Sequence, residues 1–496
     1  MKTIVFPLLS CVLILTASAE ADPAALLKTW CDAMIVRQAK STGDRGIDGA
    51  LLCPACGFMH GRAADIVYPM CVMWARTGES RYLDAAISAV RWTDYNMTRS
   101  DGAWCNDWKS SWRGTVTFAQ IALGKTLVAY EKKLPREIVD EWRGLFIRHS
   151  EYLIRLFYGN KKFRPVINYP VAFVECMALA AKLTGESRYR DLAQRMLTET
   201  VVPSFLPDGL FTGEGDPANG RSANGRAFVD FGYNLEESLP SLLESSELLQ
   251  DGELEAKTVT VAKTHLEFML PDGAIDNSCG SRLEKWTYYG SRTSDGVVPL
   301  LLGLANRNVL WASKALGRHL DLLSHCTLPS GLLAGGLHYG DADEYACIHH
   351  TFTHAKALAV LVEKGWARSD DCQQMPREIS PRAVHFDSIA TDLAAVGKWR
   401  VTVSLNDGYR YDRGSSTTGG SVTMLWHEDF GPVLAATMYR FKMVEPLNFQ
   451  EMRHAGCVNS TVPCIEANGF SNVLDFGLFG EMRHGGSPNE CRIMAA

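Results

Sequence analysis

The chain has 496 residues, of which 46% are hydrophobic and 21% are charged, as in an ordinary water-soluble globular protein. Its formal net charge of −6 gives no general attraction to nucleic acid or to an anionic membrane, so an acidic ligand would need local arginines and lysines. This length predicts one large domain and a smaller one.

The first residues are typical of a signal peptide. Lys2 precedes an apolar run over residues 4–15, and Ala17-Ser18-Ala19 matches a cleavage site. The run is too short to span a bilayer, and it continues past Cys11, which argues against a lipid anchor there. We therefore expect residues 1–19 to be removed and the mature protein to be secreted or periplasmic, with no transmembrane segment.

Two short signals recur along the chain. The hexapeptide Thr-Gly-Glu-Ser-Arg-Tyr of residues 77–82 returns unchanged at residues 184–189. A turn signal, Asp-Gly or Ser-Gly, follows at steps of about 60 residues or twice that, which is a period typical of stacked helical hairpins. Its four occurrences are residues 101–102, 208–209, 272–273 and 330–331.

Apolar spacing predicts twelve helices, of which some are apolar on all sides and others carry charge on one face. They cover residues 23–40, 62–76, 80–96, 114–130, 136–157, 171–183, 187–202, 235–250, 253–270, 296–305, 309–326 and 352–364. This alternation predicts an inner and an outer ring, an (α/α)6 toroid over residues 20–375. The alternative is an irregular α-solenoid, because it is also built from stacked helical repeats.

The pattern of apolar and polar residues changes after about residue 375. Period-two alternation in residues 399–404, with further strand-like runs at 421–426 and 433–439, predicts a C-terminal antiparallel β-domain over residues 376–496 that resembles a short sandwich. The tail from Glu481 to Ala496 is expected to be a loop. A ring and a small β-domain together give a mainly helical fold class.

Six polar, aromatic-rich loops each lead into an apolar helix, and a closed ring would gather them around one central pocket. The first contains Cys53, Cys56, His60 and Arg62. Two cysteines and a histidine suggest zinc, but a structural site wants four ligands and no second C-x-x-C pair exists, so a local disulfide or plain packing is favoured. His60 and Arg62 could meet a carboxylate or donate protons.

The second, fourth and fifth loops also carry binding chemistry. Tryptophans beside amide and carboxylate groups hold sugar rings, although some will only fill the gap between hairpins. The fourth loop is rich in glycine but lacks the sequence of a phosphate loop. The fifth combines arginines, a lysine, aromatics and acids, and arginine forks suit the carboxylate of a uronic acid. The candidate substrate-binding residues in these three loops are Asn106, Asp107, Trp108, Trp112, Tyr233, Asn277, Arg282, Lys285, Trp286, Tyr289 and Arg292.

The sixth loop leads into a histidine-rich helix start. His350 and His354 are four residues apart and share a helix face, yet no third metal ligand is evident, so a histidine acting as acid, base or donor to the substrate is favoured over a metal. A buried histidine with a purely structural role is the other possibility. We therefore expect neither a metal nor another cofactor.

The loop segments resemble those of a known group of proteins. The segments CPACGFMHGR, CNDWKSSWRG, GRAFVDFGYNLEES, KWTYYGSRTSDG and CIHHTFTHAKAL are together similar to six-hairpin carbohydrate-active enzymes. They resemble glycoside hydrolase family 154, the exo-acting β-glucuronidases, and more distantly the heparinase II/III-type polysaccharide lyases. The resemblance implies an (α/α)6 toroid with a C-terminal β-domain and chemistry on uronic acids.

The main interpretation is an exported glycoside hydrolase that releases terminal, β-linked glucuronic acid. Glycosidic hydrolysis usually needs two carboxyl groups, and four acids lie at entrances to predicted inner helices: Asp230, Glu236, Asp276 and Asp295. Glu236 and Glu237 are neighbours on a helix, so both cannot face the pocket. The expected partner is a glycan bearing uronic acid, and a homo-oligomer is compatible with the sequence.

Two alternatives stay open. A polysaccharide lyase acting by β-elimination would use Tyr288 or Tyr289 with His349 or His350, and Asn277 and Arg292 would stabilise the intermediate. A non-catalytic glycan-binding protein would present aromatic rings without converging acids and bases, and the fifth loop argues against it.

Overall fold

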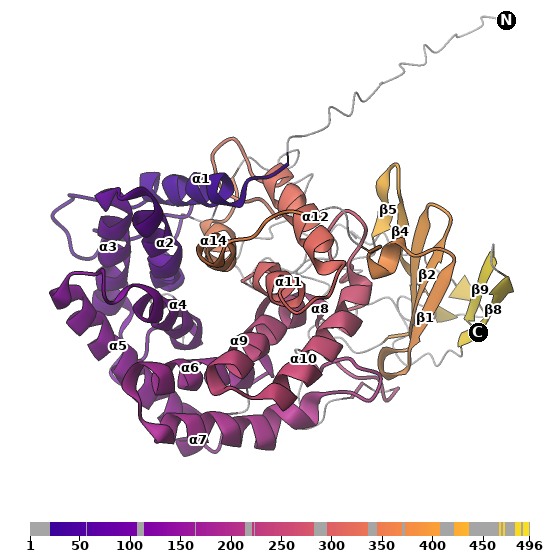
Figure 1. The fold of residues 1–496 in the computed structure, drawn as a ribbon, viewed down its shortest axis with the longest axis horizontal. Coiled ribbons are helices and arrows are strands. Elements are labelled where there is room, and N and C mark those ends of the chain that lie inside the picture. The colour runs from indigo at the N-terminus through magenta and orange to yellow at the C-terminus, as the bar shows by residue number, and fades with distance from the viewer. Residues whose placement is uncertain are drawn as a thin grey trace, which may run out of the picture.

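A ring of helices with a β-sheet beside it makes up the computed structural model (Figure 1). The structure describes residues 20–55, 57–106, 114–163, 165–213, 221–222, 224–281, 295–335, 345–369, 373–406 and 421–435, and four short strands after residue 465. The expected signal peptide, residues 1–19, lies outside this part of the chain.

Six helices surround the centre of the ring. Each contacts the next, and the last contacts the first, so the inner ring is closed. They bury residues on nearly all sides, as their apolar sequences require. In chain order they are α2 (Val67–Thr77), α4 (Thr115–Tyr130), α6 (Asn168–Thr184), α9 (Leu239–Leu249), α11 (Val298–Ala305) and α14 (Ile348–Lys364).

Among the described residues, six longer helices lie outside this ring and pair with the inner ones. They expose a charged face and bury the other, so the sequence-based prediction of an (α/α)6 toroid is confirmed. They are α1 (Pro23–Val36), α3 (Ser80–Met97), α5 (Arg136–Ile154), α7 (Ser187–Met196), α10 (Gly252–His265) and α12 (Ala312–His325).

Several predicted helices are broken into shorter turns at the ends nearest the loops. Residues Gly61–Ile66 form a 3-10 turn before α2 rather than its first turn, and α8 (Phe231–Tyr233) with a π-turn over Asn234–Ser238 precedes α9. Further short turns follow α5, α7 and α10: Arg155–Gly159, Leu197–Val201, Val202–Ser204 and Leu266–Phe268. Apolar spacing does not distinguish these tighter or wider turns from an α-helix.

The repeated hexapeptide builds the same turn twice. Gly78 and Gly185 end α2 and α6 in the left-handed conformation, with φ of 74° and 75°, which glycine adopts at little cost. The tyrosine of each copy then donates a hydrogen bond to an acid on the preceding outer helix: Tyr82 to Asp32 at 2.7 Å, and Tyr189 to Glu151 at 3.0 Å. Each copy therefore fixes both the turn and the packing of adjacent outer helices.

The second repeated signal forms a small hairpin after an outer helix. Its glycine has φ between 77° and 88° in all four copies. One β-bridge closes each hairpin, and it joins two residues that are six positions apart in the sequence. The pairs are Thr98 with Trp104, Phe205 with Phe211, Met269 with Ile275, and Thr327 with Leu333. These hairpins direct the chain toward the loops that precede the inner helices.

The C-terminal region contains a five-stranded antiparallel meander in the order β1-β2-β3-β4-β5. Its strands are β1 (Arg382–Phe386), β2 (Thr391–Val396), β3 (Trp399–Ser404), β4 (Ser421–His427) and β5 (Gly431–Ala435). Two further pairs join β6 (Glu466–Ala467) to β7 (Phe470–Ser471) and β8 (Met482–Ser487) to β9 (Glu490–Ala495).

The expectation that Glu481–Ala496 is a loop is therefore wrong. Strands β8 and β9 pair from Met482 opposite Ala495 to Ser487 opposite Glu490. Because this segment contains two glycines and several polar residues, it lacks the alternation of apolar and polar side chains that is typical of a strand. Backbone pairing across a short turn does not depend on apolar side chains.

The sheet is joined to the ring by an aromatic stack. Phe268, just after α10, stacks on Phe231 with ring centroids 3.8 Å apart and also contacts Phe386 of β1 at 5.0 Å. Arg382 of β1 forms an ion pair with Glu267 beside this stack. Because outer helices end and inner helices begin at this end of the ring, the sheet lies next to the predicted loops.

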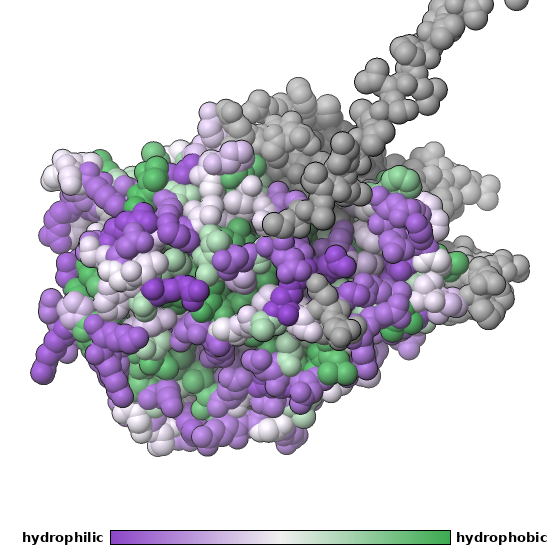
Figure 2. Space-filling view, turned by 45° about the horizontal axis from the view of Figure 1, so that its top comes forward, coloured by the Kyte–Doolittle hydropathy of each residue, from purple (hydrophilic) through white to green (hydrophobic). Residues whose placement is uncertain are grey.

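No helix among the described residues has the length and apolar character needed to cross a membrane. The face of the molecule in Figure 2 is mostly hydrophilic, with separate hydrophobic patches between the charged residues of the outer helices.

The aromatic stack should be a large part of the stability of the ring–sheet junction. We expect Phe268→Ala to lower the free energy of unfolding by about 3–5 kcal/mol, because it removes a fully buried ring and leaves a cavity. Urea unfolding followed by circular dichroism measures the loss. The control is Phe430→Ala, where the ring is 76% exposed and the change should be about 0.5 kcal/mol or less. Equal losses of unfolding free energy in the two variants would contradict a stabilising role of the aromatic stack.

Candidate functional site

The loops before the inner helices meet at one end of the ring. Successive helices run in opposite directions, so every inner helix begins at the end where the outer helices finish. The first two loops touch through their backbones: the Gly61 N–H donates to the carbonyl oxygen of Asn106 at 2.5 Å. A Cβ on Gly61 would lie 2.0 Å from the Cys105 carbonyl oxygen, so only glycine fits there.

Three buried charges and one partly buried charge occupy the centre of the ring below these loops. Arg62 donates to Asp65 at 2.5 Å and to Asp295 at 3.3 Å. Lys356 of α14 reaches the same two acids, at 3.4 Å and 2.7 Å. The Arg62 guanidinium also lies 4.7 Å from the ring centre of Phe118. Burial alone would lower the pKa of Arg62, but the two carboxylates outweigh it and raise the pKa.

A third acid lies beside this balanced network. Glu237 is buried and accepts a hydrogen bond from the Asn168 side-chain amide at 3.0 Å. Burial, and then the negative charge of Asp295, raise its pKa well above the usual value, although Arg62 and Lys356 act in the opposite direction. Two cations already balance two anions, so the surroundings of Glu237 favour its neutral form over its charged form.

Histidines cluster where α14 begins. His349 lies 5.5 Å from His60, and His350 lies 4.3 Å from His354, measured between ring centroids. His354 donates from Nδ1 to the His350 carbonyl oxygen at 3.0 Å, since a carbonyl can only accept. Its Nε2 lies 3.9 Å from Glu236. These side chains are buried, and they bring the first, fourth and sixth loops together.

Glu236 and Glu237 are therefore both buried but contact different neighbours. They lie in the π-turn before α9, where Glu236 approaches His354 on α14 and Glu237 approaches Asn168 on α6. Of the two, Glu237 belongs to the central charge network.

Asp230, Tyr233 and Asn277 take part in local turns. Asp230 caps α8, because its carboxylate accepts the Tyr233 backbone N–H at 3.1 Å. Asn277 forms a turn in which its carbonyl oxygen accepts from the Gly280 N–H at 3.2 Å, and its side chain lies against Gly280. The three side chains are at most 7% exposed.

Asp276 lies at the junction with the sheet rather than in the central network. Its carboxylate accepts from the Ser278 hydroxyl at 2.5 Å and from the Thr402 hydroxyl of β3. Arg377 is 3.7 Å away. Asp276 is fully buried among these partners, so its contacts join ring and sheet.

Nine of the sequence-predicted site residues lie outside the part of the chain that the structure describes. They are Asp107, Trp108, Trp112, Arg282, Lys285, Trp286, Tyr288, Tyr289 and Arg292. The residues that the structure does bring together come from the first, fourth, fifth and sixth loops.

Sequence reasoning did not identify Asp65, Lys356 or Cys347 as site residues. The signal for Lys356 was available, because a single lysine in the middle of an otherwise apolar helix must find a buried acid. Asp65 carried no such signal, since an acid three residues after an arginine is common on exposed helices.

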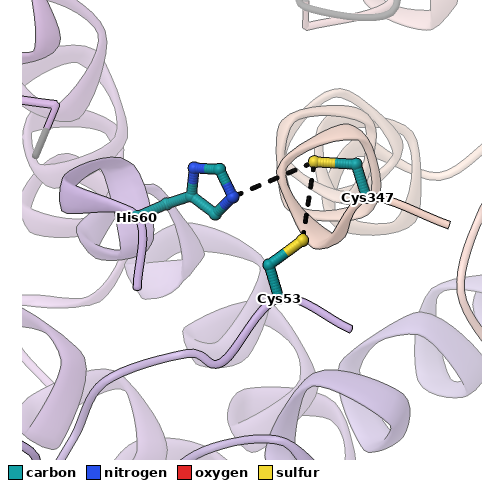
Figure 3. A group of neighbouring side chains, drawn as sticks. All are labelled: Cys53, His60 and Cys347. Atoms are coloured by element: carbon teal, nitrogen blue, oxygen red, sulfur yellow. Dashed lines mark hydrogen bonds between the residues drawn. The ribbon is translucent and has the colours of Figure 1, made fainter. Parts of the chain in front are cut away.

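One group among the described residues has the composition of a metal site. The Cys53 and Cys347 sulfurs are 3.7 Å apart, and the Cys347 sulfur is 3.9 Å from His60 Nε2. All three side chains are buried, and Figure 3 shows them pointing toward one another. The sequence favoured packing or a local disulfide for Cys53, because the chain has no second C-x-x-C pair to complete a four-ligand site.

Two known protein-family models and one characterised relative match this chain. The model of the ulvan lyase N-terminal domain matches residues 27–378, and that of the ulvan lyase C-terminal domain matches residues 383–477. The chain belongs to the ulvan lyase family. A family member from Formosa agariphila, a broad-specificity ulvan lyase, is 36% identical over 438 residues, which are 86% of this chain and 67% of that protein.

Solved structures resemble the ring alone. A sugar epimerase from a ruminal bacterium and the cellobiose 2-epimerase from Bacillus thermoamylovorans each align with a TM-score of 0.51, at 12% and 11% identity. Each alignment covers 69% of this chain and 99% of the other. An α-1,6-mannanase from Salegentibacter sp. aligns with a TM-score of 0.50 at 11% identity, over 69% of this chain and 100% of the mannanase. At these identities the likeness shows the six-hairpin fold and nothing about the reaction.

Membership of the ulvan lyase family makes the chain a carbohydrate-active enzyme of the (α/α)6 type that acts on a polysaccharide. The more specific resemblance to glycoside hydrolase family 154 is not supported, and the comparisons favour the lyase interpretation over the hydrolase.

The raised pKa of Glu237 predicts a pH-dependent stability. Above about pH 4.5, the usual value, the unfolded chain loses this proton and the folded chain keeps it, so stability falls as pH rises through the folded pKa. Glu237→Gln is neutral in both states. We expect it to unfold less readily than the natural chain at neutral pH, by roughly 1–3 kcal/mol, and to match it in acid.

Urea unfolding at a series of pH values measures the difference. The control is Glu428→Gln, an exposed glutamate between β4 and β5, which should leave the pH dependence unchanged. A constant offset between the natural chain and Glu237→Gln at all pH values would show that Glu237 ionises normally in the fold.

Proposed function

We propose that the protein cleaves ulvan, or a related uronate-containing polysaccharide, by β-elimination. The observation that carries the proposal is its 36% identity, over 86% of the chain, to a broad-specificity ulvan lyase. The reaction breaks the bond between a uronate ring carbon and the glycosidic oxygen, and it leaves a carbon–carbon double bond in the new terminal sugar.

This chemistry sets three requirements on the protein. A base must take the proton from the carbon beside the carboxylate, a donor must stabilise the charge that develops on that carboxylate, and an acid must protonate the leaving oxygen. No water molecule is consumed. Imidazole is suited to the proton transfers because its unperturbed pKa lies near neutrality.

His349 and His350 are the described residues best placed for proton transfer. They occupy the first turn of α14, at the end of the ring where the loops meet. His354 supports His350 from the next turn by its hydrogen bond to the His350 carbonyl oxygen. We assign the base or the acid to this pair.

The carboxylate of the substrate needs a different partner from Arg62. The Arg62 guanidinium is buried and already bound to Asp65 and Asp295, so breaking that network would leave two uncompensated acids. The remaining candidates for this role are Asn106, Asn277 and the positive residues of the fifth loop, Arg282, Lys285 and Arg292.

The positions of the acids also support elimination over hydrolysis. Hydrolysis needs two carboxyl groups beside the glycosidic bond. Asp230 caps a helix, Asp276 is bound at the sheet junction, and Asp295 is paired with Lys356 and Arg62. Glu236 is fully buried beside His354.

One incubation with ulvan and a panel of uronate polysaccharides tests the proposal. We expect ultraviolet absorbance from an unsaturated uronate to rise with no release of saturated uronic acid, because elimination creates a conjugated double bond. Release of free saturated glucuronate without new absorbance would establish a hydrolase instead.

Substituting the histidine pair tests the assignment. We expect His350→Gln or His349→Gln to lower kcat by about 10²–10⁴-fold, because proton transfer by a positioned side chain contributes that much. The matched control is His325→Gln at the exposed end of α12, which should retain full activity. Full activity in both α14 variants, with melting temperatures unchanged, would remove the pair from the reaction.

A further inference from the structure

The Cys53, His60 and Cys347 group takes no part in the proposed elimination. Two of its members lie in the first loop and the third caps α14, nearly 300 residues later. Their exposed fractions are 0%, 1% and 4%. Their potential ligand atoms all lie within 4.8 Å of one another.

The sulfur–sulfur separation matches that of a tetrahedral zinc site, and the sulfur–nitrogen separation is somewhat longer. With metal–sulfur bonds of about 2.3 Å and a metal–nitrogen bond of about 2.0–2.1 Å, two sulfurs lie about 3.8 Å apart, and a sulfur and a nitrogen about 3.5 Å apart. The observed values are 3.7 Å for Cys53 to Cys347 and 3.9 Å for Cys347 to His60. A disulfide would bring the two sulfurs to about 2.05 Å.

Local structure holds the first two ligands in position. Leu52 and Met59 form a β-bridge, and the Cys53 N–H donates to the Phe58 carbonyl oxygen at 3.0 Å. Leu52 and Cys53 are thus paired with Met59 and Phe58, and His60 follows immediately after this pairing. One local structure therefore holds two of the ligands, and the start of α14 supplies the third.

We propose that Cys53, His60 and Cys347 bind a zinc ion. Thiolate and imidazole ligands select zinc over magnesium or calcium, which prefer oxygen ligands. Buried thiols bind the divalent ion as thiolates and release their protons, so the ion offsets the charge that burial would otherwise disfavour. The fourth position of the tetrahedron is filled by water or by a further side chain.

The ion has a positioning role at the site. His60 is two residues before Arg62 of the central charge network, and Cys347 is two residues before His349. Zinc therefore ties the first loop to the start of α14, at the point where the first and last inner helices close the ring. Loss of the zinc ion should therefore make both the first loop and the start of α14 less rigid.

Metal analysis of the full chain tests the site without any substrate. After incubation with zinc and dialysis, we expect about one zinc per natural chain by mass spectrometry of the elements. Cys53→Ala and Cys347→Ala should each lose at least ten-fold of this content. The matched control is Cys326→Ala, a buried cysteine at the end of α12, which should keep its zinc.

A chelator should lower the melting temperature of the natural chain and of Cys326→Ala, and leave that of Cys53→Ala unchanged, because the metal binds the folded state. Cobalt(II) in place of zinc gives a second readout on the natural chain, which keeps the test valid if the variants fold poorly. We expect absorbance bands of thiolate-bound, tetrahedral cobalt.

Three results would overturn the proposal. They are the absence of both stoichiometric zinc and the cobalt bands in the natural chain, zinc content unchanged in Cys53→Ala and Cys347→Ala, and a disulfide between Cys53 and Cys347 in peptides analysed without reduction. None of these measurements depends on the reaction proposed above, so either proposal can fail alone.

Discussion

The closed ring depends on the buried network of Arg62, Asp65, Asp295 and Lys356. These charges come from the first loop, the fifth loop and the last inner helix, and all but the partly exposed Asp295 are removed from water. A buried charge without a partner is strongly destabilising, so the two cations and two anions are stable only when the three segments meet. The network therefore makes the ends of the ring depend on each other, and its two cations are already paired with acids other than Glu237.

The ring was predictable from the sequence because its signals are local. The glycine of each repeated turn and the tyrosine that reaches the preceding outer helix lie within six residues, so a short match reveals a complete structural unit. The paired strands β8 and β9 were missed because their sequence lacks the apolar alternation that makes a strand recognisable. The prediction succeeded where side-chain pattern determines the element and failed where backbone pairing does.

Sequence reasoning could name candidate site residues but could not say which residues they contact. Arg62 and Asp295 were both identified as candidates, yet the sequence separates them by more than 200 residues, and their ion pair emerges only from ring closure. For the same reason Cys347 could not be joined to Cys53. A count of acids favoured hydrolysis, because it could not show that Asp230 and Asp276 already have structural partners.

Position along α14 separates the two kinds of polar residue at the centre. His349 and His350 lie in its first turn, where the loops meet, and Lys356 lies two turns deeper among buried acids. A helix is rigid over this distance, so fixing Lys356 by ion pairs also fixes the direction in which the histidines leave the first turn. The charge network thus fixes the helix on which the two histidines proposed for proton transfer lie.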